Sequence, residues 1–175
     1  MQIYFFLIAA LLYAACAVLP SSRARLIAGL TGVAGLAHAA TLWFDLVAPG
    51  AVRFGFSAML SAALWVSVGA YWIENRNFSL DGLRRMVMPS AVIAIGLAWA
   101  FPGSQVSMEG KSAVFGWHIA VAVLAYSTLT IAAFHAVLMA LQESRLHTRS
   151  ESRGFIGSAL DQLPALLTME KLLFR

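Results

Sequence analysis

Long apolar runs separated by short polar loops dominate the chain. Five of them are predicted to be spans, at residues 2–19, 26–47, 54–73, 86–101 and 114–141. Most approach the roughly 20 residues that an α-helix needs to cross a hydrocarbon core about 30 Å thick. The pattern predicts an all-α, polytopic transmembrane bundle of about five spans over residues 1–143.

A polar stretch follows the fifth run, and apolar residues then return at helical spacing at Ile156, Leu160, Leu163 and Leu167. This spacing is typical of an amphipathic helix that lies on a membrane surface. Residues 144–175 are therefore predicted to form a cytoplasmic linker and an amphipathic tail.

Composition supports a multi-pass membrane protein. Hydrophobic residues make up 61% of the chain and charged residues 11%, whereas about a quarter of the residues of a soluble domain are charged. The net charge of +4 comes from Lys and Arg in the predicted loops, where they act as orientation signals. Membrane lipid is thus the expected partner, and nucleic acid is not.

The basic residues alternate between loops. Two follow the first run and three follow the third, whereas the second and fourth runs are each followed by one. By the positive-inside rule, the N-terminus faces outward, and the loops that contain Arg23 and Arg76 are cytoplasmic, as is the tail.

Two histidines in different runs are the candidate ligands. At about 1.5 Å per residue, His38 and His118 lie about 13 Å and about 6 Å below the outer helix ends, and His135 lies about 25 Å further along the fifth run. Two imidazoles at similar depth are what a haem iron with two axial histidines requires. The alternative, left open by the spacing, is that each histidine is hydrogen-bonded inside the bundle.

Other chemistry has little support. The chain has no HExxH motif, no Ser/His/Asp arrangement and one cysteine, Cys16, which is expected to be a buried thiol in the first helix. Gly29, Gly32 and Gly35 form a strip that lets another helix approach closely. We expect no enzymatic activity.

Several segments resemble one family in order along the chain. They are GLAHAATL in the second run, RFGFSAMLSAALW opening the third, GWHIAVAVLAYSTLTIAAFHAVLMALQESRLH in the fifth, and LPALLTMEKLLFR near the end. The sequence resembles the cytochrome c assembly family of haem-handling membrane proteins, the group of CcsA, CcmC and HemX-like proteins. The resemblance implies that His38 and His118 are ligands of a b-type haem iron and that the protein resides in a bacterial inner membrane.

Two departures from the family pattern stand out. The tryptophan-rich external segment of WWD type is missing, since residues 103–112 contain no tryptophan. The family also continues past the LPALL segment into further membrane helices, whereas this sequence stops at Arg175, which indicates a truncated or reduced relative.

The expected function is therefore haem binding that assists cytochrome c assembly or haem handling, with apocytochrome or other assembly components as partners. The alternative is a membrane regulatory or scaffold subunit that modulates a haem-synthesis or respiratory enzyme through its basic tail.

Overall fold

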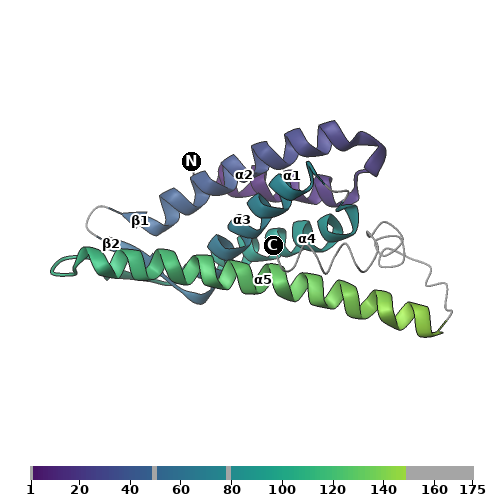
Figure 1. The fold of residues 1–175 in the computed structure, drawn as a ribbon. Helices are drawn as coiled ribbons and strands as arrows, with labels where there is room; N and C mark the ends of the chain where they lie inside the picture. Colours follow the sequence, from purple (N-terminus) through teal and green to yellow (C-terminus); the bar gives the residue numbers. More distant parts are fainter. Residues whose placement is uncertain (1, 49–50, 78–79, 149–175) are drawn as a thin grey trace.

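The computed structural model describes residues 2–48, 51–77 and 80–148, and the predicted amphipathic tail lies outside these residues. The described chain is a bundle of long helices with a small sheet at one end (Figure 1). The helices are α1 (Gln2–Val18), α2 (Ala24–Leu46), α3 (Phe56–Glu74), α4 (Asp81–Ala100) and α5 (Ala113–Thr148), with a single 3₁₀ turn, η1 (Ser21–Arg23), between the first two. The predicted all-α bundle is confirmed.

Four of the helices, α2 to α5, are long and apolar enough to cross a membrane, while α1 is a shorter apolar helix of 17 residues. Small side chains such as Ala9, Ala34 and Ala91 are completely buried, whereas Leu11 and Leu36 are largely exposed. Small residues inside a bundle let helix backbones approach closely, and large apolar residues outside suit contact with acyl chains. The arrangement is that of a membrane protein.

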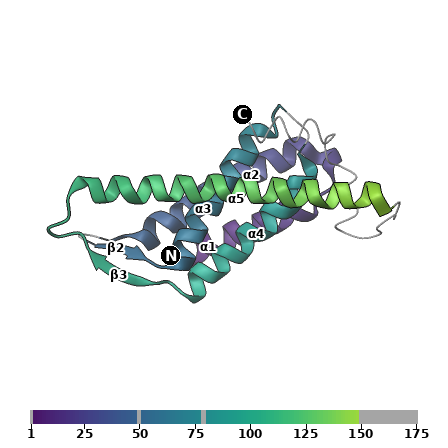
Figure 2. The same cartoon turned by 60° about the horizontal axis from the view of Figure 1, so that its bottom comes forward.

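The helices pack in a defined order. α1 packs against α2 and α4, α3 packs against α4 and α2, and α5 packs mainly against α3. α5 is the least enclosed helix, because Ser127, His135 and Leu138 are its only buried residues among those whose side chains are described. Figure 2 shows α5 running across the outside of the other helices.

A three-stranded antiparallel sheet joins the two loops at one end of the bundle. Its strands are β1 (Val47–Ala48), β2 (Ala51–Phe54) and β3 (Ser104–Ser107), in the order β1–β2–β3. Phe54 pairs with Ser104 at one end of the β2–β3 ladder, and Ala51 pairs with Ser107 at the other. The apolar pattern predicts loops over most of these residues, and the sheet was not predicted.

Gly103 makes the approach of these two loops feasible. Its φ is +74°, and a Cβ built there would lie 2.8 Å from Gly55 Cα and would also clash with the Phe54 carbonyl oxygen. Only glycine adopts this backbone conformation readily, so Gly103 fixes where α4 ends and β3 begins.

Replacing Gly103 with alanine is expected to separate β2 from β3. The cost should be about 1–3 kcal/mol, as for a residue held in an unfavourable backbone region, and should be local. Amide hydrogen exchange should accelerate in residues 51–54 and 104–107 and stay slow in α1. Gly110→Ala is the matched control, because Gly110 also has φ +74° but its Cβ would meet no atom within 4 Å. Equal acceleration in both variants would contradict the close-approach explanation.

Two predicted helix ends differ from the structure. α4 begins at Asp81, five residues before the predicted Met86, and α5 continues to Thr148 instead of ending at Leu141. Charged residues near 84 and 145 suggested loops, but charged side chains can be accommodated in the terminal turns of a helix. For Arg84 the reason is specific, because its guanidinium is buried against the end of α1.

Candidate functional site

His38 lies at the centre of a polar contact between three helices. Its Nε2 is 2.8 Å from the Ser61 hydroxyl of α3, and its Nδ1 is 3.4 Å from the Tyr13 hydroxyl of α1. The Tyr13 ring also meets the imidazole edge-on, with 5.8 Å between ring centroids. Both His38 and Tyr13 are fully buried.

This geometry suits a neutral imidazole that holds the bundle together. A neutral imidazole offers one donor and one acceptor nitrogen, and each hydroxyl can play either role. Both ring nitrogens therefore have partners, as the hydrogen-bonded alternative for His38 requires. An iron at either nitrogen would have to displace Ser61 or Tyr13 from a site with no exposed surface.

His118 has a different environment. It lies near the start of α5, its side chain is exposed, and it makes no hydrogen bond within the described part of the chain. The apolar side chains of Val114, Trp117 and Val121 around it are also exposed. An imidazole on an apolar membrane-spanning surface is costly without a partner, and of the three histidines whose side chains are described His118 is the exposed one.

The two predicted haem ligands are not brought to one site by the described residues. His38 points to contacts on α1 and α3, and α3 is also the helix against which α5 packs. α3 therefore lies between the helix of His38 and the helix of His118. The described residues thus place the two imidazoles on opposite sides of α3, with His38 buried and His118 exposed.

His135 is buried beside α3 and α4. Its Nδ1 lies 2.9 Å from the Ile131 carbonyl oxygen, one turn earlier on α5. Since a carbonyl can only accept, Nδ1 carries the proton and donates it. Nε2 of the neutral ring is then the acceptor, and His135 lines a cavity together with Tyr71 and Glu74.

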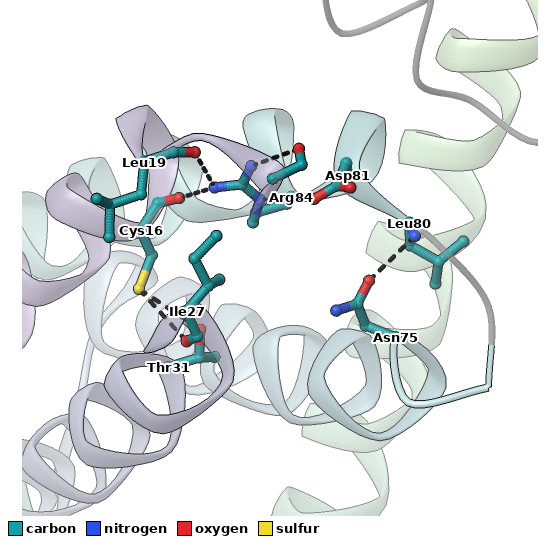
Figure 3. Close-up of polar contacts among 9 residues, drawn as sticks. Cys16, Leu19, Ile27, Thr31, Asn75, Leu80, Asp81 and Arg84 are labelled. Atoms are coloured by element: carbon teal, nitrogen blue, oxygen red, sulfur yellow. Dashed lines mark hydrogen bonds and ion pairs between the residues drawn. The ribbon is translucent and has the colours of Figure 1, made fainter. Parts of the chain in front are cut away.

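Arg84 forms the second polar cluster of the bundle (Figure 3). Its guanidinium is fully buried and donates to the carbonyl oxygens of Cys16 and, at 3.0 Å, of Leu19. It also contacts the Ser21 hydroxyl and pairs with Asp81 at 3.3 Å. The last carbonyls of a helix lack intrahelical partners and carry partial negative charge, so Arg84 completes the C-terminal end of α1.

Cys16 is a free, buried thiol, which confirms the prediction from the sequence. Thr31 of α2 donates to its sulfur at 3.5 Å, and the sulfur lies 3.8 Å from the Ile27 carbonyl oxygen. The buried thiol lies where α1 contacts α2, beside Ile27 and Thr31 (Figure 3).

The glycine strip of α2 faces an apolar groove shared with α3. Trp65 and Trp72 of α3 border it and donate from their indole nitrogens to the Gly35 and Ala28 carbonyl oxygens, both at 2.9 Å. A Cβ on Gly32 would meet the Trp72 ring at 3.6 Å. The strip thus admits the Trp72 ring at Gly32, while a Cβ built on Gly29 or Gly35 would meet no atom within 4 Å.

The partners of His38 and the contacts of Arg84 were not predicted from the sequence. Tyr13, Ser61 and Arg84 are separated from their contacts by 23 to 68 residues, and the spacing of apolar residues carries no information on such pairs. One local signal existed for Arg84, since Asp81 precedes it by three residues on the same helical face.

Comparison with known proteins finds no relative of this chain. No family model, no curated protein and no solved structure matches the chain.

Proposed function

We propose that the protein binds haem in a bacterial inner membrane and assists cytochrome c assembly, with His118 as the residue that ligates the iron. The exposed ring of His118 on an apolar, membrane-length helix is the observation that supports this proposal. The motifs GWHIAVAVLAY and LPALLTMEKLLFR support it from the sequence side.

The surface of α5 around His118 suits a large, flat, apolar ligand. Ala125 lies two turns along the same face and is exposed, and Ala122 between them is half-exposed. Alanines leave the surface beside the imidazole low, while Val114 and Val121 supply exposed apolar area. Within a membrane such area already faces acyl chains, so its contribution to porphyrin binding is van der Waals packing, and the bond from the imidazole to the iron supplies the specificity.

The proposed role of the chain is holding and presenting the cofactor. His118 supplies a nitrogen ligand, and α5 keeps that ligand at the end of the bundle that carries the sheet. His38 contributes indirectly by joining α1, α2 and α3. Haem supplies the redox-active iron, and other assembly components or apocytochrome are the proposed recipients.

Substitution of His118 by alanine should remove haem binding. The full chain, purified in detergent and titrated with haem, is expected to show a Soret band that sharpens and shifts on binding, and His118→Ala should lose this change. Removing the sole nitrogen ligand in this proposal should weaken binding at least tenfold, comparable with loss of a single metal-ligand or supporting group.

His135→Ala is the matched control, because it removes another α5 imidazole that the proposal does not use. It should bind haem like the unsubstituted protein. Unchanged haem titration of His118→Ala would overturn the proposal, as would failure of the unsubstituted protein to bind haem.

A further inference from the structure

A cavity of about 190 Å³ lies between α3, α4 and α5. Neither His38 nor His118 lines it. Most of its wall is apolar. The apolar lining residues come from the three helices and from the connection between α3 and α4, and they are Ala70, Leu80, Leu83, Val87, Ile131 and Phe134. Ser67, Tyr71, Glu74 and His135 supply its polar atoms.

Two of these residues, the buried Tyr71 and the half-buried Glu74, each have a buried polar atom without a partner among the described residues. Tyr71 is 4% exposed, and neither its hydroxyl nor the Oε2 atom of Glu74 has a hydrogen-bond partner among the described residues. Ser67, by contrast, donates to the Ala63 carbonyl oxygen at 2.9 Å. An unpaired buried donor or acceptor costs about 1–3 kcal/mol. A ligand in the cavity that forms hydrogen bonds with Tyr71 and Glu74 would remove this cost.

The position of Glu74 strengthens the need for such a ligand. Glu74 is the last residue of α3, where the helix dipole places partial negative charge, although the backbone amide of Asn77 pairs with the Glu74 carbonyl. A carboxylate there is disfavoured unless a donor approaches it. A ligand hydroxyl that donates to Glu74 would relieve the repulsion.

His135 adds an acceptor to the same wall. With the Nδ1 proton donated to the Ile131 carbonyl, Nε2 of the neutral ring is an acceptor. The cavity therefore combines two acceptors, Glu74 and His135, with a Tyr71 hydroxyl that can donate or accept.

The size of the cavity indicates a ring-sized ligand. A dry apolar cavity of about 150 Å³ holds benzene, so about 190 Å³ holds a benzene-sized ring with a small substituent. A charged ligand would be expensive to bury among these apolar walls. Water alone would satisfy the polar atoms but would leave the apolar walls hydrated.

We propose that this cavity binds an uncharged phenolic molecule, with the ring against the apolar wall and the hydroxyl between Tyr71 and Glu74. The phenol donates to the carboxylate, and its oxygen accepts from the tyrosine hydroxyl. This site is independent of the haem proposal and involves none of its residues.

The test compares two ligands that differ by one hydroxyl. The full chain in lipid nanodiscs is titrated with 4-propylphenol and with propylbenzene, and partition into protein-free nanodiscs is subtracted. The phenol is expected to bind about five- to tenfold more tightly than propylbenzene, as one or two net hydrogen bonds predict. Equal affinities, or saturable binding of neither ligand, would overturn the proposal and indicate a cavity filled by water only.

Single substitutions locate the binding. Tyr71→Phe and Glu74→Gln should each weaken phenol binding about fivefold and leave propylbenzene binding nearly unchanged. Tyr126→Phe is the matched control, since Tyr126 is 63% exposed, and it should bind both ligands normally. Phenol affinity that is insensitive to Tyr71→Phe and Glu74→Gln would contradict the assignment, and circular dichroism of each variant establishes that it is folded.

Discussion

Replacing Arg84 with methionine is expected to destabilise the bundle by about 3–5 kcal/mol, the cost typical of removing one partner from a buried charged network. Methionine retains much of the length of the side chain but cannot donate to the Cys16 and Leu19 carbonyls. These carbonyls then remain buried and unpaired at the end of α1. Reversible unfolding in mixed detergent micelles, followed by circular dichroism, measures the loss.

Two further substitutions identify the origin of this loss of stability. Arg84→Lys keeps the charge but lacks the planar fork that reaches several acceptors at once. The stability of this variant should therefore lie between that of Arg84→Met and that of the unsubstituted protein. Arg25→Met is the control, because Arg25 is exposed near the start of α2, and a surface change should stay within about 0.5 kcal/mol. Equal effects of Arg84→Met and Arg25→Met would refute a structural role for the buried guanidinium.

His38→Ala should be the next most damaging substitution, at about 2–4 kcal/mol, because it opens a cavity and leaves buried hydroxyls unpaired. The imidazole connects Tyr13 of α1 with Ser61 of α3. Its removal should therefore loosen the contacts of α2 with both neighbours. Unfolding measurements on the detergent-solubilised chain provide the free energy.

A double-mutant cycle separates the hydrogen bond from the cavity. Ser61→Ala alone should cost about 1 kcal/mol, and the combined variant should cost clearly less than the sum, since both changes break the same 2.8 Å contact. Strict additivity would show that the two side chains do not interact. Tyr13→Phe should have the smaller effect, because its contact with His38 is longer, at 3.4 Å.

The apolar pattern identified the helices well for a physical reason. In a membrane, backbone groups must be satisfied within each helix, so length and hydropathy nearly determine where the helices lie. The predicted 2–19, 26–47 and 54–73 runs differ from α1, α2 and α3 by at most two residues at each end. The sheet escaped prediction because it depends on Phe54 meeting Ser104 across 50 residues of chain.

The candidate site was harder to predict, because a helix surrounded by lipid is apolar on every side. Counting residues along the predicted spans placed His38 and His118 at similar depths in the membrane. The depth of a residue does not determine the direction in which its ring points. The rotation of α2 and α5 is set by packing contacts such as those of Tyr13, Ser61 and Leu138. The buried polar atoms of Tyr71 and Glu74 depend on three-helix packing in the same way.

The most direct test of the haem proposal is the absorption spectrum of His38→Gln after titration with haem. Glutamine keeps polar atoms near Tyr13 and Ser61 but is a poor iron ligand. Circular dichroism first establishes that the variant is folded. If His118 alone ligates the iron, this variant retains the Soret change of the unsubstituted protein, whereas His118→Ala loses it. A folded His38→Gln variant without the Soret change would contradict ligation by His118 alone and favour ligation by both histidines.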